Sequence, residues 1–253
     1  MIAPHEIRSV PGRHIGREVR LFDSPPSTND LAMECDAPDG TAFVANHQSQ
    51  GRGQHGRVWT SQPGESLLLS IRLRPPPELA RPVILTAFAA VAVGDAIREL
   101  TGVQARIKWP NDLLVRGKKV CGILIEAGRA TVVGIGLNLN QTIEAFVDAG
   151  LPDATSLALV GGKTIDRDHA LNCVLDRLDA EWSRLLAGER TPLESDWKWR
   201  IGLLGRGVIV ERADGNFVAG RLLEMGFDAL ELLRDDEVLE SIQPELVRHI
   251  HAV

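Results

Sequence analysis

Apolar and polar residues alternate along several short stretches of the chain, and this period of two is typical of β-strands. Residues 17–22, 103–109 and 131–140 show this pattern, and residues 41–48 and 66–75 are further strand-like runs. Because they are interleaved with helical patterns, the sequence predicts a mixed β-sheet packed with helices.

Two longer stretches have the period of an α-helix. Residues 83–100 are apolar on nearly all sides, which predicts a helix buried in the core. Residues 168–188 carry a single apolar stripe and predict an amphipathic helix. We expect Asp168 to cap its N-terminus and Gly188 to end it.

Two local signals add a short helix and a hairpin. Two prolines follow the first strand, and Ser27 or Thr28 is then suited to cap a helix with Asp30 in its first turn. Farther along, Arg116-Gly117 separates two strand-like runs, which predicts a tight hairpin turn.

The last fifty residues have a different pattern, with four short strand-like runs separated by turn residues. Such a pattern is typical of a small β-barrel. We therefore predict an α+β fold with two domains, a larger one at 1–202 and a small barrel at 203–253.

Composition excludes several classes of protein. The 253 residues are 44% hydrophobic and carry a net charge of −6, which does not suit a protein that coats nucleic acid. No apolar run approaches the ~20 residues that cross a bilayer, and the N-terminus lacks the apolar core of a signal peptide. We expect a cytoplasmic protein whose cysteines (Cys35, Cys121 and Cys173) are reduced.

Glycine and arginine are concentrated in the stretch GRGQHGRVW, residues 51–59. Glycines allow successive backbone N–H groups to converge on an anion, and arginines add two-pronged contacts to phosphate. The stretch fits G-x-G-x-x-G in letters, but a strand follows it instead of a helix, so it does not predict a dinucleotide fold. The two alternatives are a loop that wraps an anion and a basic tether.

The strand at 131–140 has an unusual face. Its period of two places Gly134, Gly136, Asn138 and Asn140 on one side and apolar residues on the other. Glycine within a strand marks either close approach by a ligand or a bulge and tight packing. The sequence alone leaves both interpretations open.

Two lysines stand side by side in KWPNDLLVRGKKVCGILIE. Neighbouring strand residues face opposite ways, so only one of Lys118 and Lys119 points into any one site. A lysine here either steadies a phosphate or belongs to a solvated hairpin tip. Asp112 either caps the turn after Pro110 or lies in an active site.

Together these motifs resemble those of the biotin protein ligases, also called biotin–[acetyl-CoA-carboxylase] ligases. The matching segments occur in the order typical of the family: STND at 27–30, QSQGRGQHGRVW at 48–59, KWPNDLLV at 108–115, KVCGILIE at 119–126 and GIGLNLN at 134–140. The resemblance implies a class II synthetase-like biotin/lipoate ligase domain followed by an SH3-like barrel.

The resemblance also implies a reaction, its cofactors and its partner. Biotin and ATP, with Mg²⁺, would form biotinyl-5′-AMP, and a lysine of the biotin carboxyl carrier domain of a carboxylase would then take the biotin. Nucleic acid and membrane are not expected as partners, and a homodimer is left open. Because few residues precede Ser27, we expect a monofunctional enzyme without a helix-turn-helix domain.

Site residues follow from the matching positions. The resemblance implies that Ser27, Thr28, Asn29 and Gln48 bind the ureido ring of biotin and that Gly134 and Gly136 form the floor. It assigns catalytic roles to three residues. Arg52 would bring carboxylate and phosphate together, Lys119 would steady the phosphate charge, and Asp112 would position or deprotonate the incoming lysine. The remaining implied contacts with biotin or the adenylate are Gly51, Gly53, Gln54, Arg57, Trp59, Asn111, Gly122 and Asn138.

Two of these positions carry a question of their own. Many family members have an arginine where this chain has Gln54, and His55 and Arg57 could partly supply the missing charge. Trp59 either closes the loop over the adenylate or anchors the following strand in the core. The alternatives for the whole protein are a lipoate ligase with the same fold and, from another class, a nucleic-acid-binding module that uses the Gly-Arg stretch.

Overall fold

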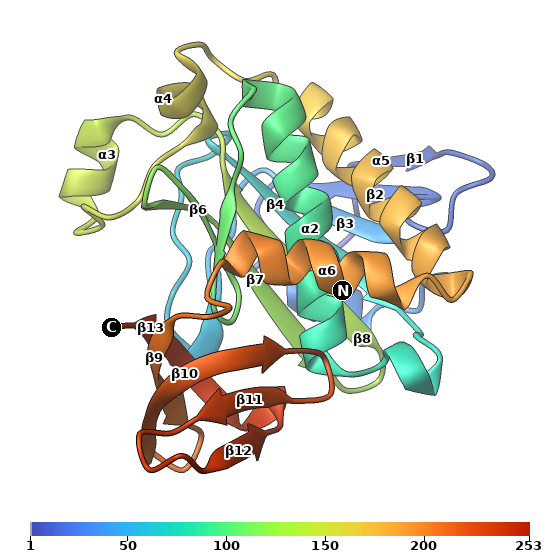
Figure 1. The fold of residues 1–253 in the computed structure, drawn as a ribbon. Coiled ribbons are helices and arrows are strands. Elements are labelled where there is room, and N and C mark those ends of the chain that lie inside the picture. Colours follow the sequence, from blue (N-terminus) through green and yellow to red (C-terminus); the bar gives the residue numbers. More distant parts are fainter. Residues whose placement is uncertain (1) are drawn as a thin grey trace.

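The computed structural model describes residues 2–253, and within them the chain forms two β-sheets (Figure 1). The larger sheet has eight strands in the order β1-β2-β3-β4-β8-β7-β6-β5. It is mixed because β2 and β3 run parallel while the other neighbouring pairs run antiparallel. Its strands are β1 Glu6–Ser9, β2 Glu18–Phe22, β3 Ala42–Ala45, β4 Ser66–Leu73, β5 Arg106–Lys108, β6 Asp112–Val115, β7 Lys118–Ala127 and β8 Thr131–Asn138.

One face of this sheet is covered by the two long helices (Figure 1). Helix α2 (Pro82–Thr101) is rich in alanine and valine and packs against both α5 (Arg167–Leu186) and α6 (Arg190–Ile201). This confirms the expected buried helix. Phe88 and Trp182 join α2 to α5, with ring centroids 5.1 Å apart.

The opposite face carries the short helix α1 (Thr28–Glu34), which packs on a separate small core that includes Phe22 and Phe43. Ser27 caps α1, as expected, and its hydroxyl accepts from the N–H of Asn29 at 3.2 Å. This second face is the one left open for a site. The remaining short elements are α3 Ile143–Asp148, α4 Leu157–Gly161 and the 3₁₀ turns η1 Gln54–Gly56, η2 Pro77–Leu79 and η3 Pro244–Leu246.

The second sheet is antiparallel, has the order β12-β11-β10-β9-β13 and is consistent with the predicted small barrel. Its strands are β9 Gly207–Arg212, β10 Phe217–Met225, β11 Leu230–Leu233, β12 Leu239–Ile242 and β13 Val247–Ala252. It docks on the larger sheet's helices through Trp197 and Phe227, whose ring centroids lie 5.2 Å apart. The Trp109 indole also donates to the Val247 carbonyl at 3.1 Å. The proposed division after residue 202 falls between α6 and β9.

Several sequence predictions need correction. The N-cap of α5 is Asp166, which accepts from the N–H of His169, and Asp168 lies in the first helical turn. The strands are shorter than the alternating patterns at 41–48, 103–109 and 131–140, because the chain turns away from the sheet beyond their ends. The sequence pattern also missed β1, α3, α4, α6 and β13. Among the described residues, no helix is long and apolar enough to cross a membrane.

Candidate active site

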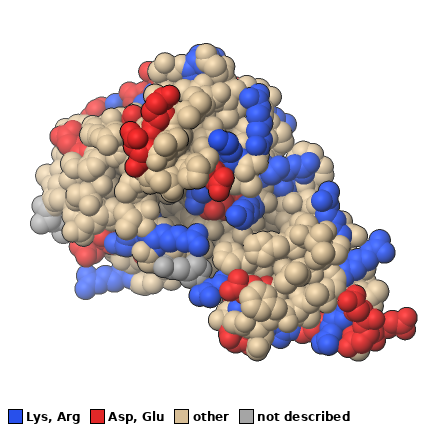
Figure 2. Space-filling model, turned by 90° about the vertical axis from the view of Figure 1, so that its left-hand side faces the viewer, with Lys and Arg blue, Asp and Glu red and all other residues tan. Residues whose placement is uncertain are grey.

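A cavity of about 1100 Å³ opens on the sheet face that carries α1. It is lined from β4, β7, β8, the 51–59 segment, the KWPND segment, α3 and β13. Figure 2 shows the hollow surface with Lys and Arg side chains around it. Except for Gly51, all of the residues predicted for the site line this cavity. Gly51 lies at the neck of its loop, where a Cβ would be 2.3 Å from the Trp59 carbonyl oxygen.

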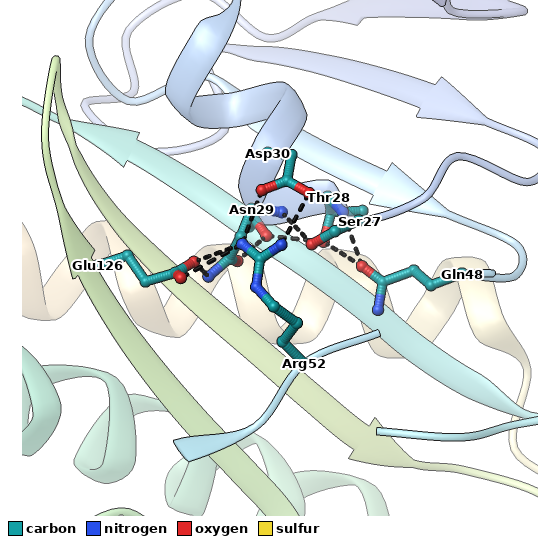
Figure 3. Close-up of polar contacts among 8 residues, drawn as sticks. Ser27, Thr28, Asn29, Asp30, Gln48, Arg52 and Glu126 are labelled. Carbon is teal, nitrogen blue, oxygen red and sulfur yellow. Dashed lines mark hydrogen bonds and ion pairs between the residues drawn. The ribbon is translucent and has the colours of Figure 1, made fainter. Parts of the chain in front are cut away.

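One wall of the cavity is a set of buried polar residues from the STND segment (Figure 3). The backbone N–H and the hydroxyl of Thr28 donate to Gln48 Oε1 at 2.7 and 2.9 Å. From β4 below, the Ser70 hydroxyl contacts Thr28 Oγ1 at 2.7 Å and Asn29 Oδ1 at 2.5 Å. Because these groups hold one another, the wall presents fixed donors and acceptors without needing a ligand to order them.

Arg52 connects this wall to the Gly-Arg loop (Figure 3). Its two terminal nitrogens form a fork on the Asp30 carboxylate at 2.8 and 2.7 Å, and Nη2 also lies 3.2 Å from both oxygens of Glu126. Glu126 in turn accepts from Asn29 Nδ2 at 2.6 Å. The Asp30 hydrogen bonds hold the pKa of Arg52 above its usual value. The guanidinium is thus already balanced by carboxylates of this chain.

Glycines on β7 and β8 form the floor. A Cβ at position 134 would lie 2.3 Å from Asn29 Oδ1, and a Cβ at position 136 would lie 2.5 Å from Trp59 Cε2. The β8 register runs without a shift through both positions. This excludes the bulge interpretation. The missing side chains let Asn29 of the wall lie close to Gly134 and let Trp59 of the loop lie close to Gly136.

Lys119 lines the cavity from β7, whereas its neighbour Lys118 is exposed and does not line it. Lys119 Nζ is 2.6 Å from Asp112 Oδ1 and 5.6 Å from the centroid of the Trp59 ring. Asp112 begins β6 and does not cap a turn. The adjacent Asn111 donates to the Ile123 carbonyl at 2.7 Å, which ties β6 to β7 beside the ion pair.

The Gly-Arg stretch forms a narrow loop. Gly53 N–H donates to the Arg57 carbonyl at 2.7 Å, and Trp59 N–H donates to the Gly51 carbonyl at 3.0 Å. Between these bonds the loop projects into solvent, and Val58 is 71% exposed. The Trp59 indole lies on the glycine floor inside the cavity, so it does not anchor the main core.

Comparison with known proteins agrees with this geometry. Residues 21–140 match the biotin/lipoate A/B protein ligase family. The chain is 36% identical over 193 residues to the biotin–[acetyl-CoA-carboxylase] ligase of Mycobacterium tuberculosis, covering 72% of this chain and 68% of that protein. It is 34% identical over 239 residues to the bifunctional ligase/repressor BirA of Bacillus subtilis, covering 92% of this chain and 73% of that protein.

The chain belongs to the biotin/lipoate A/B protein ligase family.

The solved structures extend the likeness to the whole fold. The biotin protein ligase from Aquifex aeolicus, in complex with biotin and ATP, superposes with a TM-score of 0.80 at 27% identity. The superposition covers 93% of this chain and 99% of that one. The predicted family and fold are therefore confirmed, and the protein is a ligase.

Several residues that support or reach this ligase's cavity were missed from the sequence. Asp30 and Glu126 hold Arg52, and Ser70 supports the wall. Ser70 could have been found from the period of two in β4. Ser66, Ser70 and Arg72 all fall on one face of this strand, and the other face is entirely apolar. His249 and His251 reach the cavity from β13 of the second sheet. Their alternation was visible, but nothing local placed that strand beside the site.

A second polar cluster lies at the α3 end of the cavity. Gln141 Nε2 donates to Ser66 Oγ at 2.6 Å and to Asn138 Oδ1 at 3.2 Å. Asn138 Nδ2 donates in turn to the Thr155 carbonyl at 3.0 Å. Asn138, which the sequence had placed in the site, is therefore held in one amide orientation.

The cavity's acids do not form a cage for a metal. Among the described residues, no group of three or more His, Cys, Asp or Glu side chains is placed to hold an ion. Mg²⁺ in proteins often keeps several waters and is held by substrate phosphates with one or two carboxylates. The residues present therefore fit Mg²⁺ only as part of MgATP, with Asp112 as the nearest cavity carboxylate to Lys119.

Proposed function

We propose that this protein is an ATP-dependent biotin–protein ligase that acts through biotinyl-5′-AMP and delivers biotin to one lysine of a carboxylase carrier domain. The observation that carries the proposal is the shared cavity. A buried hydrogen-bonding wall at Ser27 to Asn29 and the ammonium of Lys119 line the same glycine-floored space. That arrangement suits a substrate with a polar ring at one end and a reacting carboxylate at the other.

At the ring end, Ser27, Thr28, Asn29 and Gln48 provide hydroxyl and amide groups in fixed positions. The ureido ring of biotin carries two N–H donors and one carbonyl acceptor, so it needs groups of both kinds. Gly134 and Gly136 carry no side chains, so Asn29 and the Trp59 ring lie close to the backbone of β8 and bound the space proposed for the ring and chain.

At the reacting end, two anions must meet. The biotin carboxylate attacks the α-phosphorus of ATP, an oxygen–phosphorus bond forms, and pyrophosphate leaves with the electron pair of the broken bond. Lys119 supports this step by placing a positive charge where negative charge develops. Arg52 supplies a second positive charge. Because it is paired with Asp30 and Glu126, an incoming anion would have to share the guanidinium with these carboxylates.

In the second step the lysine amine attacks the acyl carbon of the mixed anhydride, and AMP leaves. Asp112, 2.6 Å from Lys119, is placed to accept a hydrogen bond or a proton from the arriving amine. Gly53, Gln54, Arg57 and Trp59 would cover the adenylate, since all four line the cavity from the Gly-Arg loop. Such a cover protects a reactive anhydride from water. Asn111, Gly122 and Asn138 complete the proposed lining.

A transfer assay tests this function. The purified protein is incubated with biotin, MgATP and a biotin-free carrier domain, and the product is mapped by mass spectrometry. We expect one labelled lysine and, without the carrier, biotin-dependent exchange of pyrophosphate into ATP. Labelling with lipoate in place of biotin would contradict the substrate assignment. That result would favour the lipoate-ligase alternative.

A further inference from the structure

The sheet edge formed by β5, β6 and β7 is strongly basic in a protein with a net charge of −6. Between residues 104 and 119 the only acid is Asp112, and the basic residues are Arg106, Lys108, Arg116, Lys118 and Lys119. Lys and Arg side chains surround the hollow in Figure 2. Residues 104–119 therefore have a charge opposite to that of the whole chain.

Three of these residues, Lys108, Arg116 and Lys118, form what we call the basic edge. Arg106 is committed elsewhere, since it donates to the Trp199 carbonyl and stacks on the Trp199 ring. Within residues 2–253 the basic edge makes no ion pair, although arginines in both sheets and in the helices do. Three exposed cations on neighbouring strands and their turn repel one another, and an outside anion bound there would relieve this repulsion.

The tip of the edge has an unusual backbone. Arg116 has a φ of +51° and Gly117 a φ of +80°. Hairpin turns of this kind favour asparagine or glycine at both positions, because other residues are strained in the left-handed region. Turn geometry therefore does not explain an arginine there.

The basic edge is too extended to serve a small molecule alone. Lys108 lines the cavity, but Arg116 and Lys118 do not. Lys118 Nζ donates at 3.2 Å to the carbonyl of Pro152, which follows the cavity-lining Leu151, and the ammonium keeps further donors for another partner. A ligand confined to the cavity would miss two of the three cations, whereas a protein surface lying across the mouth would meet all three.

We propose that the basic edge is the docking surface for an acidic face of the carrier protein, and this proposal rests on the proposed function. The strand register supports it. Lys108 on β5 lies directly opposite Asp112 on β6, and such cross-strand neighbours have Cβ atoms roughly 5 Å apart. When a lysine of the carrier reaches Asp112, the carrier residues next to that lysine would lie over Lys108 and over the hairpin tip at Arg116. Complementary charge there speeds encounter and fixes orientation.

The test uses variants that separate docking from chemistry. Arg116→Asn removes the charge and suits the left-handed backbone, so the variant is expected to fold at least as well as the original protein. Lys118→Gln removes the second charge. Arg129→Asn is the matched control, because Arg129 is also exposed, makes no ion pair with any residue from 2 to 253 and lies beyond the opposite end of β7.

Two reactions are measured for each variant: biotin-dependent pyrophosphate exchange, and transfer to a biotin-free acidic carrier domain at low and high salt. For the double variant Arg116→Asn/Lys118→Gln, we expect the KM for the carrier to rise roughly five- to tenfold at low salt. Exchange and kcat should stay within about twofold, and the salt dependence of KM should weaken. Arg129→Asn should behave like the original protein.

The outcomes distinguish the two proposals. Normal exchange with an unchanged KM in the double variant would overturn the docking surface alone. Loss of exchange in the double variant would also overturn it, by showing that the edge serves the nucleotide. Salt-sensitive binding of short duplex DNA that the double variant loses, with KM unchanged, would assign the edge to another polyanion. Absence of exchange in the original protein would overturn the proposed function and this inference with it.

Discussion

The STND wall and the Gly-Arg loop meet over the same glycine floor, yet they are built in opposite ways. Ser27 and Thr28 are each 3% exposed, and their polar groups are bonded to Gln48, to Ser70 and to the backbone of α1. Across the cavity, Val58 in the loop is 71% exposed. A few backbone bonds and the Trp59 ring hold this loop in place.

This difference matches the two tasks that a ligase of this kind must perform. Recognition of a neutral polar ring benefits from groups whose positions are fixed before binding, because little conformational entropy is then lost. Enclosure of a reactive intermediate requires a segment that opens and closes, and such segments come from the least stable parts of a fold. Arg52 belongs to the loop but is bonded to the wall, so it connects the two.

The largest effect is expected at Lys119, which lines the same cavity as both regions and lies 5.6 Å from the centroid of the Trp59 ring. Lys119→Ala should lower the rate of pyrophosphate exchange about 100- to 1000-fold, because a preorganised charge at the reacting phosphate is lost. Biotin binding, measured by calorimetry, should be largely kept since the wall is intact. Lys118→Ala is the control on the other side of the same strand, and its exchange rate should not change. An unchanged exchange rate in Lys119→Ala would show that this lysine takes no part in adenylate formation.

Two glycines on one strand face provide the sharpest test of the comparison. Gly134→Ala pushes against Asn29, which Ser70 and Glu126 hold. Gly136→Ala pushes against Trp59, which belongs to the loop. We expect Gly134→Ala to lower the free energy of unfolding by about 1–3 kcal/mol and to weaken biotin binding, because the wall cannot retreat.

For Gly136→Ala the loop should move aside, so its unfolding free energy should fall by less than about 1 kcal/mol, as for changes away from packed sites. Urea denaturation of both variants measures the difference. Equal losses of stability would show that the loop is packed as firmly as the wall.

A smaller effect is expected where the two regions are linked. Asp30→Asn removes the charge that holds the Arg52 fork, so the ligand-free loop should be cut by trypsin several times faster. The unfolding free energy should change by less than about 1 kcal/mol, because both side chains are about two-fifths exposed and water screens the pair. Asp30→Glu restores the carboxylate and should restore protection. If the original protein and both variants are cleaved at the same rate, Asp30 does not hold the loop in place.

The sequence predicted the parts of this site that depend on residues close together in the chain. The cap at Ser27, the opposed Lys118 and Lys119, the hairpin at Arg116-Gly117 and the glycine face of β8 all follow from short spacing rules. Helices α3 and α4 have six and five residues, too few to establish a period. Such elements depend on tertiary packing, and local propensity is a weak guide to them.

Contacts between distant segments could not be predicted in the same way. Arg52 meets Asp30 and Glu126 across separations of 22 and 74 residues, and only the order of strands in the sheet brings them together. The sequence favoured Arg52 as an anion-binding residue but gave no sign that two carboxylates already occupy it. Likewise, His249 and His251 reach the cavity only because the second sheet docks where it does.

The smallest effect concerns Gln54, which stands where the family resemblance implies an arginine. Gln54 begins η1, lines the cavity and is half-buried. Gln54→Arg should slow release of biotinyl-5′-AMP about three- to tenfold, because an arginine–phosphate contact adds a charge-assisted hydrogen bond. Radiolabelled adenylate is formed on the enzyme and its loss is followed after an unlabelled chase. Gln54→Leu, of similar size and without a donor, is the matched control and should release the adenylate at least as fast as the original.

The expected gain from Gln54→Arg is modest for a physical reason. The loop is exposed to water, which screens any new charge, and Arg57 already lines the same side of the cavity. If Gln54→Arg, Gln54→Leu and the original protein release the adenylate at one rate, the side chain at 54 does not touch the ligand. The loop would then retain the intermediate by covering it, through Trp59 on the glycine floor, and its contribution would be enclosure without added charge.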